Sequence, residues 1–580
     1  MTQHFGNQAG GVVLEFRSPC GGSISLWLDG AEAPAAQWQL PEAKQWRRQL
    51  FALPKPLSGE HACEWRLEGG AELKNWTIHQ QEEMVVGRNP LTGMDFPDVD
   101  MIRVGDTYYM ISTTMYFMPG AVILRSYDLI NWEYCTRIYD VLEDTPRQRL
   151  DEGNAYSAGM WAATLRFHKG RFYVIFVAND THKTYLYRAD DIMGPWQKSE
   201  MEGFYHDCSL LFDDDERVYL VYGGKEIHLL ELNAELTGPE PGGLNRIIAD
   251  SGESDFLGYE GSHLYKINGK YYLFVIHSLR ERWWRVETCL MSKSLTGAFR
   301  GGIVMDDHAG LRNDGVAQGG IVDTPDGRWY AILFQDSGAV GRIPLLMPMT
   351  WENDFPVLGE DGKVPLEVCN LSTRPGYVYA PLWHSDSFES GRLEGGWEWN
   401  HIPQLDRVTV GEGQLAIRTG RVDEVFTQTQ NMLTQRALQP ACAAEVTLDA
   451  SALEAGDVAG LCALQSRWGY VGLRRTAEGF EVVYAARGLE EAETGFVREC
   501  RPWKESQIRL RVEMHFSAER DYACFFYSEK GQWKQLGTEQ PLYYLLDHFT
   551  GYRFALFVQS TQKAGGQAVF RDYVMEQLAE

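Results

Sequence analysis

Three acidic side chains stand at matching distances before tyrosines in the middle of the chain. Asp207 and Glu260 each lie twelve residues before a tyrosine, and Asp98 lies eleven before one. When a fold holds carboxylates close together, each disfavours the ionised form of the others, so the pKa of one of them rises. One carboxylate then serves as a base while another stays protonated as an acid, as an acid–base hydrolase requires. Glycoside hydrolysis is the common chemistry of such a pair.

These distances come from a repeat in the sequence. Five short hairpins share one form, in which a polar turn is followed by an aromatic or apolar pair and a strand. The second members of the pairs are Tyr109, Tyr173, Tyr219, Tyr272 and Tyr330. A repeat of about 50–60 residues with several strands is typical of one propeller blade of four antiparallel strands. Five repeats predict five blades.

The blade prediction places five side chains around one opening. Each blade begins with its innermost strand, so equivalent positions converge at one mouth of the central tunnel. The positions before the tyrosines hold Asp98, Trp161, Asp207, Glu260 and Gln318. Trp161 offers an apolar face on which a sugar ring can stack. The offset of eleven at Asp98 requires a bulge or a loop there, because a slip of one residue turns a strand side chain to the opposite face.

The elements around this repeat are also strands. Long segments of helical period are nearly absent, and short alternating or apolar runs bounded by Gly, Asp and Asn recur from end to end, which predicts an all-β protein. We expect a small β-rich accessory region at 1–83, similar to a carbohydrate-binding module, and a five-bladed β-propeller catalytic domain at 84–372. Strand-like runs at 384–580 predict a C-terminal β-sandwich.

Composition narrows the classes of partner. The 580 residues carry a formal net charge of −26, with a pI near 5.0. Such a field repels phosphate backbones and anionic membranes, so we expect neither nucleic acid nor a membrane as a partner. No secretory signal is visible at the start, and the ten cysteines include no C-x-x-C pair, which indicates reduced thiols and a cytoplasmic location.

Several motifs together resemble glycoside hydrolase family 43, the family of β-xylosidases, α-L-arabinofuranosidases and related arabinanases on five-bladed propellers. The motifs are NPLTGMDFPDVDMIRVGDTYYM (89–110), MPGAVILRSYDLINW (118–132), MWAATLR (160–166), HDCSLLFDDD (206–215), YEGSHLYK (259–266) and DGRWY (326–330). Residues 384–580 resemble the concanavalin-like β-sandwich that often follows the propeller in the β-xylosidase branch.

The resemblance implies roles for single residues. Asp98, in F-P-D, matches the general base, and Glu260, in Y-E-G-S-H, matches the general acid. Asp207, in H-D-C-S, matches the carboxylate that orients the acid and modulates its pKa. Residues expected to bind substrate are Trp161, Arg342, His206, Gln318 and Phe117. We expect no metal ligand and no required cofactor; a Ca²⁺ site is left open, since Gln318 stands where many relatives have the histidine that supports one.

These observations predict an exo-acting, inverting glycosidase that releases terminal pentoses, α-L-arabinofuranose or β-D-xylose, from oligosaccharides derived from hemicellulose. The family's inversion implies that Asp98 and Glu260 flank the sugar, about 6.5–9.5 Å apart, with room for a water molecule. Two alternatives stay open: an endo-acting arabinanase or xylan-active hydrolase, and a propeller that binds carbohydrate without catalysis. A homo-oligomer is also left open.

Overall fold

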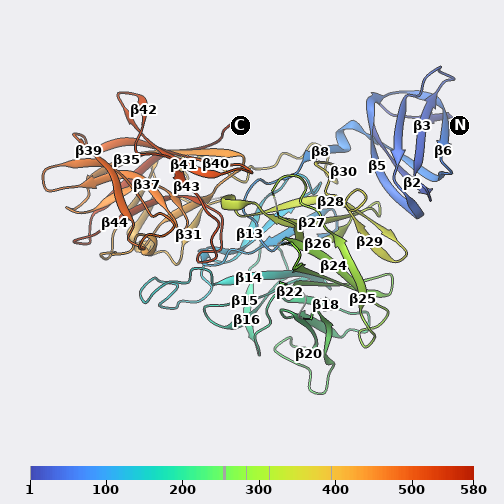
Figure 1. Cartoon of the computed structure of the whole chain (residues 1–580), viewed down its shortest axis with the longest axis horizontal. Coiled ribbons are helices and arrows are strands. Elements are labelled where there is room, and N and C mark those ends of the chain that lie inside the picture. The colour runs from blue at the N-terminus through green and yellow to red at the C-terminus, as the bar shows by residue number, and fades with distance from the viewer. Residues whose placement is uncertain (1, 253–255, 283, 313, 394, 580) are drawn as a thin grey trace.

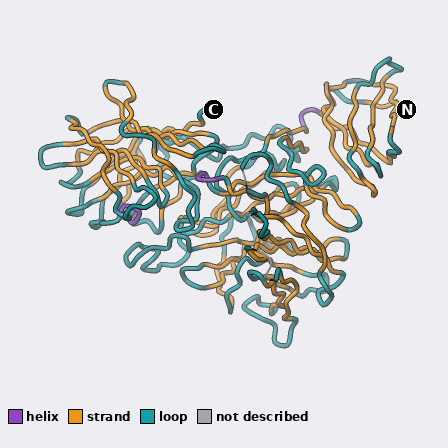
Figure 2. Tube along the Cα trace, in the orientation of Figure 1, coloured by secondary structure: helices purple, strands orange, loops and turns teal. Residues whose placement is uncertain are grey.

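The computed structural model describes residues 2–252, 256–282, 284–312, 314–393 and 395–579, and strands joined by turns and loops dominate them (Figure 2). The helical segments of these residues are four short 3-10 turns: η1 (Gln81–Glu83), η2 (Gly338–Val340), η3 (Leu405–Arg407) and η4 (Phe426–Gln428). No helix in the described ranges is long and apolar enough to cross a membrane. The all-β prediction is confirmed.

The N-terminal region forms two small antiparallel sheets that pack together around apolar and tryptophan side chains, apart from the sandwich at the other end of the molecule (Figure 1). One sheet has the order β1 (Thr2–His4), β6 (Glu60–Glu68), β3 (Gly22–Leu28) and β4 (Ala36–Leu40). The other has the order β5 (Ala43–Leu57), β2 (Ala9–Ser18) and β7 (Glu72–Gln80).

Five four-stranded antiparallel sheets follow as the blades of a propeller. The first blade contains β9 (Asp100–Val104), β10 (Thr107–Ser112), β12 (Gly120–Ser126) and β13 (Glu133–Tyr139). The second contains β14 (Met160–His168), β15 (Arg171–Ala178), β16 (Lys183–Ala189) and β17 (Gln197–Met201). The third contains β18 (Ser209–Phe212), β19 (Val218–Tyr222), β20 (Glu226–Leu232) and β21 (Asn245–Asp250). The fourth contains β22 (Leu257–Ile267), β23 (Lys270–Ser278), β24 (Arg285–Ser292) and β25 (Arg300–Met305). The fifth contains β26 (Val316–Asp323), β27 (Trp329–Asp336), β28 (Arg342–Glu352) and β29 (Phe355–Leu358).

The first strand of each blade is the innermost one. β9 contacts β14, β14 contacts β18, β18 contacts β22, β22 contacts β26, and β26 returns to β9, so the ring closes. Outside this ring, β8 (Met84–Arg88) pairs with β30 (Glu367–Leu371), which joins the two ends of the propeller segment. The five-bladed propeller is confirmed, and the starts of its inner strands meet around the axis.

The C-terminal region is a sandwich of two larger sheets (Figure 1). The first sheet has the order β11 (Phe117–Met118), β31 (Glu398–Asn400), β34 (Leu433–Arg436), β44 (Arg553–Gln559), β36 (Val458–Leu464), β37 (Gly469–Arg475), β38 (Phe480–Ala486) and β39 (Phe496–Trp503). The second contains β32 (Val408–Gly411), β33 (Gln414–Arg418), β45 (Gln567–Gln577), β35 (Ala441–Ala452), β40 (Gln507–Phe516), β41 (Asp521–Glu529), β42 (Gln532–Gln535) and β43 (Gln540–Pro541). The sandwich prediction is confirmed, whereas the exact domain limits stay a prediction.

The sandwich is joined firmly to the propeller. Strand β11 leaves the first blade and pairs with β31, so the propeller contributes one edge of a sandwich sheet. Beside this junction, Arg436 and Arg553 of the sandwich bind the fully buried carboxylate of Glu398, and Arg137 of the first blade lies 3.1 Å from it. These contacts fix the side of the propeller that the sandwich faces.

Candidate active site

A cavity of about 600 Å³ lies where the inner strands of the blades begin. The five predicted ring residues, one from each blade, all line it: Asp98, Trp161, Asp207, Glu260 and Gln318. His206 and Arg342, predicted to bind substrate, line it as well. Asp98 and Arg342, 244 positions apart in the sequence, therefore share one site.

In every blade a residue with left-handed backbone stands at this point or directly after it. Asp98, Asp207 and Gln318 have positive φ angles of 53°, 48° and 57°, and in the other two blades the following residues, Ala162 and Gly261, have φ of 35° and 60°. Such left-handed positions cost a non-glycine residue about 1–3 kcal/mol and cluster at active sites. Asp98 precedes β9 instead of lying in it, so its side chain reaches the cavity despite the offset of eleven.

Asp98 is held by an arginine. Nη1 of Arg342 donates to Oδ1 of Asp98 over 2.5 Å, and Nε of Arg342 donates to Asp336 over 3.1 Å. Both Asp98 and Arg342 are buried. A planar guanidinium that is itself fixed by a second carboxylate holds its partner in a defined orientation. Asp98 therefore presents its remaining lone pairs in a fixed direction, as a base that orients water must.

Glu260 has the properties of an acid. Burial, and after it the neighbouring charge of Asp207, raises the pKa of Glu260 to about 7. Burial also raises the pKa of Asp207, but the Gly261 N–H donates to its Oδ2 over 3.0 Å and His206 Nδ1 lies 3.6 Å from its Oδ1, and both favour its charged form. We therefore place the proton of this pair on Glu260. Ligand atoms of His206, Asp207 and Glu260 lie within 4.8 Å of one another, a close group that does not include Asp98, although the charge of Asp98 also raises the pKa of Asp207.

One wall of the cavity comes from the sandwich, which the repeat could not predict. Tyr544, Leu546 and Phe549 line it from the loop that precedes β44. The ring of Phe549 lies 5.5 Å from that of Trp161 and 4.5 Å from the guanidinium carbon of Arg342. The only signal in the sequence is the aromatic run PLYYLLDHFTGY, whose length and glycine set it apart from the neighbouring strands.

Further charged residues that the sequence reasoning missed surround the ring. Asp336 bridges Arg342 and Arg285, whose Nη1 lies 2.6 Å from Asp336 Oδ2. Asp314 also lines the cavity, and burial, with the nearby Asp336, raises its pKa to about 6. The sequence leaves open whether Trp283 and Trp284 form a loop near the mouth or a surface stack. Trp284 lines the cavity and donates its indole N–H to Asp306, and Trp283 lies outside the described residues.

Phe117 was predicted to bind substrate, and the structure does not place it at the cavity. Its side chain is 2% exposed, and its strand pairs with β31 of the sandwich. The guanidinium carbon of Arg553 lies 3.4 Å from its ring centre. The ring therefore fills the junction between propeller and sandwich, because β11 leaves the blade at this residue.

The donor set for a metal is limited. Ligand atoms of His206, Asp207 and Glu260 lie within 4.8 Å of one another, and a metal bound there would displace the proton of Glu260, whose pKa is about 7 without one. Beside Gln318, whose N–H donates to Glu287 over 2.7 Å, burial raises the pKa of Glu287 to about 8. The prediction that no cofactor is required is not tested by this geometry.

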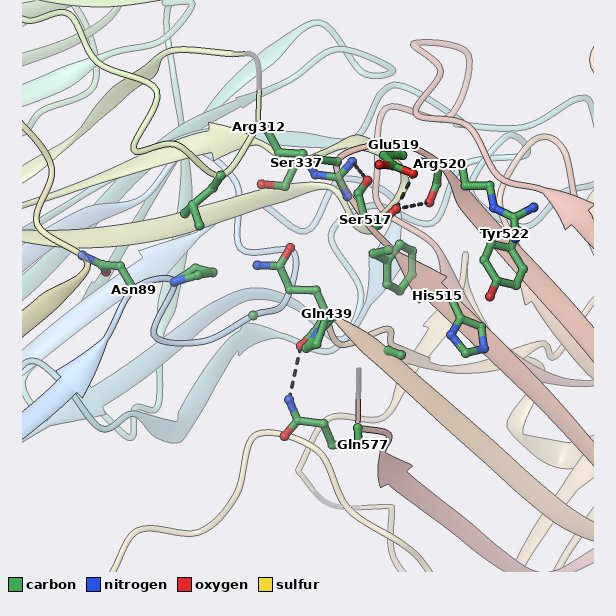
Figure 3. Close-up of a pocket in the computed structure, with 18 of the residues that line it drawn as sticks. Asn89, Arg312, Ser337, Gln439, His515, Ser517, Glu519, Arg520, Tyr522 and Gln577 are labelled. Atoms are coloured by element: carbon green, nitrogen blue, oxygen red, sulfur yellow. Dashed lines mark hydrogen bonds between the residues drawn. The ribbon is translucent and has the colours of Figure 1, made fainter.

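A second, larger cavity of about 1050 Å³ lies between the propeller and the sandwich (Figure 3). Arg312 and Ser337 line it from the propeller, and Gln439 and Ser517 from the sandwich. Its described lining residues include one carboxylate, Glu519, and none of the predicted site residues. It lacks a pair of acids and is not the candidate site.

Comparison with known proteins gives matches to both regions. The model of glycosyl hydrolases family 43 matches residues 87–356, and that of the beta xylosidase C-terminal concanavalin A-like domain matches residues 385–576. The beta-xylosidase of Formosa agariphila is 29% identical over 377 residues, which are 58% of this chain and 62% of the relative. A non-reducing end alpha-L-arabinofuranosidase of Bacteroides ovatus is 29% identical over 339 residues, 54% of this chain and 61% of the relative. The chain thus spans about three fifths of the length of these relatives.

Solved structures that are similar to this chain carry the same family name. The chain is similar to a bifunctional GH43-CE protein of Bacteroides eggerthii, with a TM-score of 0.80 and 38% identity, over 85% of this chain and 64% of the other. It is also similar to a GH43 glycoside hydrolase engineered to display both endo-xylanase and exo-arabinofuranosidase activity. That match has a TM-score of 0.77 and 28% identity, over 85% of this chain and 100% of the other.

Proposed function

Because this chain belongs to family 43 of the glycosyl hydrolases, we propose that it is an exo-acting glycosidase that releases terminal pentoses, α-L-arabinofuranose or β-D-xylose, from oligosaccharides. The observation that carries the proposal is the separation of roles in one cavity. Glu260 holds a proton up to about pH 7, and Asp98 is oriented by Arg342 outside the close group around Glu260.

The proposed reaction is a single displacement at the anomeric carbon. Asp98 accepts a proton from water while the water oxygen bonds to the anomeric carbon. At the same time the bond from that carbon to the leaving oxygen breaks, and Glu260 gives its proton to the leaving oxygen. Each carboxyl changes its protonation once, and the anomeric configuration inverts. Asp207 raises the pKa of Glu260 through its charge, so the acid keeps its proton near neutral pH.

The wall from the sandwich supports exo action. Phe549 and Trp161 enclose apolar surface beside Arg342, and Tyr544 and Leu546 extend this wall. A site closed on one side by a second domain is suited to the end of an oligosaccharide, whereas an endo-acting enzyme needs a groove open at both ends. The names of the relatives, a beta-xylosidase and a non-reducing end alpha-L-arabinofuranosidase, are consistent with exo action on pentoses.

A panel of 4-nitrophenyl glycosides tests the proposal. We expect turnover of the β-D-xyloside or the α-L-arabinofuranoside, and loss of that turnover in Glu260→Gln. No turnover of either pentoside would refute the proposed activity and favour a carbohydrate-binding propeller. Incubation with linear arabinan and xylan separates the remaining alternative: monosaccharide as the first product supports exo action, and longer oligosaccharides would contradict it.

A further inference from the structure

Asp95 lies behind the site and not in it. The side chain is 3% exposed and is not among the residues that line the cavity. Its Oδ1 accepts the backbone N–H of Arg342 in the propeller over 2.8 Å, and its Oδ2 accepts the backbone N–H of Gly551 in the sandwich over 2.9 Å. One buried carboxylate thus joins the two domains through separate oxygens.

The backbone around Asp95 is also hydrogen-bonded to both domains. Nε of Arg436, in the sandwich, donates to the carbonyl of Asp95 over 2.9 Å, and the N–H of Phe96 donates to the carbonyl of Arg342 over 2.9 Å. A Cβ on Gly341 would come within 2.3 Å of Asp95 Oδ1. The carboxylate of Asp95 is therefore packed directly against Gly341, with no room there for a larger residue.

Asp95 holds Arg342, the residue that supports the proposed catalytic base. Arg342, whose N–H it accepts, orients Asp98 and packs against Phe549, and Gly551 stands two residues after Phe549. We propose that Asp95 is a positioning residue that couples the docked sandwich to the geometry of Arg342 and Asp98, so that the sandwich is needed for turnover as well as for enclosing the sugar. This inference rests on the proposed function.

The chemistry of the two bonds explains why a carboxylate is needed. Burial raises the pKa of the Asp95 carboxyl, whereas the N–H groups of Gly551 and Arg342 and the charges of Arg436 and Arg553 lower it. In its ionised form the carboxyl accepts on both oxygens, so it satisfies both N–H groups together. The amide of Asp95→Asn accepts one N–H and turns its own NH₂ towards the other, whereas Asp95→Ala satisfies neither. A misplacement of about 1 Å at a reacting group can lower turnover about 10²-fold.

The experiment compares kcat and KM on the best aryl pentoside, at a temperature well below the melting point of each variant. We expect kcat to fall about tenfold in Asp95→Asn and about 100-fold in Asp95→Ala, with a smaller change in KM, because Asp95 does not line the cavity. The matched control is Asp128→Asn. Asp128 is also buried, at 2% exposure, and its Oδ1 accepts the N–H groups of Ile130 and Asn131 over 2.8 and 2.7 Å, away from the cavity.

The possible outcomes distinguish a failure of this inference from a failure of the proposed function. No turnover by the unaltered protein would overturn the proposed function. With an active parent, kcat within twofold of the parent in folded Asp95→Asn would overturn the positioning role, and so would an equal loss in Asp128→Asn. If Asp95→Ala does not fold, the milder Asp95→Asn still decides, because it retains the size of the side chain and one acceptor.

Discussion

Replacing Asp207 by asparagine should move the pH profile of turnover in a direction that the geometry fixes. Asp207 and Glu260 approach within 4.8 Å, and the charge of Asp207 is the second cause, after burial, that raises the pKa of Glu260 to about 7. Asparagine keeps the shape and removes the charge. The pKa of Glu260 should therefore fall, so the acid loses its proton, and the enzyme its activity, at a lower pH.

The magnitude follows from Coulomb's law. Two unit charges about 4.8 Å apart interact by about 0.9 kcal/mol at the dielectric constant of water and by about 3.5 kcal/mol at an effective constant of about 20. Since about 1.36 kcal/mol corresponds to one pH unit, the pKa of Glu260 should fall by about 0.6 to about 2.5 at this separation.

The assay is kcat/KM on an aryl pentoside from about pH 4 to about pH 9, for the parent, Asp207→Asn and Asp128→Asn, because this profile reports the acid of the free enzyme. The parent should lose activity as the pH rises through about 7. In Asp207→Asn this alkaline limb should lie at least about half a unit lower, and in Asp128→Asn it should not move. An unmoved or raised limb in Asp207→Asn would refute the assignment of the proton to Glu260.

Three other predictions concern the base, the sandwich loop and a buried acid. Asp98→Asn should lower kcat about 10²- to 10⁴-fold without lowering Tm by more than a few degrees, and an active variant would exclude Asp98 as the base. Phe549→Ala should raise KM about tenfold through loss of the apolar wall beside Trp161, and an unchanged KM in steady-state kinetics would show that the loop does not meet the sugar. Glu287→Gln should raise Tm at pH 8 but not at pH 4. The pKa of Glu287 is about 8 in the folded protein, against an ordinary 4.5. Protonation of Glu287 therefore contributes at most about 5 kcal/mol to the free energy of unfolding. This contribution is fully present below pH 4.5 and is lost as the pH rises to 8. Equal Tm changes at both pH values in thermal scans would contradict this.

The repeat made the core of the site predictable. Asp207, Glu260 and Gln318 could be brought together from their distances to paired tyrosines, because blade geometry carries equal positions to one axis. Phe549 could not be found in this way, since it comes from another domain through a loop that no repeat describes. Phe117 was misplaced for a related reason: its strand leaves the blade and completes a sheet of the sandwich. Sequence periodicity thus predicts contacts between equivalent positions of the repeats and fails where two domains meet.

The stereochemistry of the first product tests the central claim most directly. In the proposed reaction, Asp98 and Glu260 act on opposite sides of one bond in a single displacement. Proton NMR during the first minutes of hydrolysis of the preferred pentoside should show sugar whose anomeric configuration is opposite to that of the substrate, before mutarotation mixes the two anomers. Sugar released with the configuration of the substrate would require two displacements and would contradict the roles given to these carboxylates.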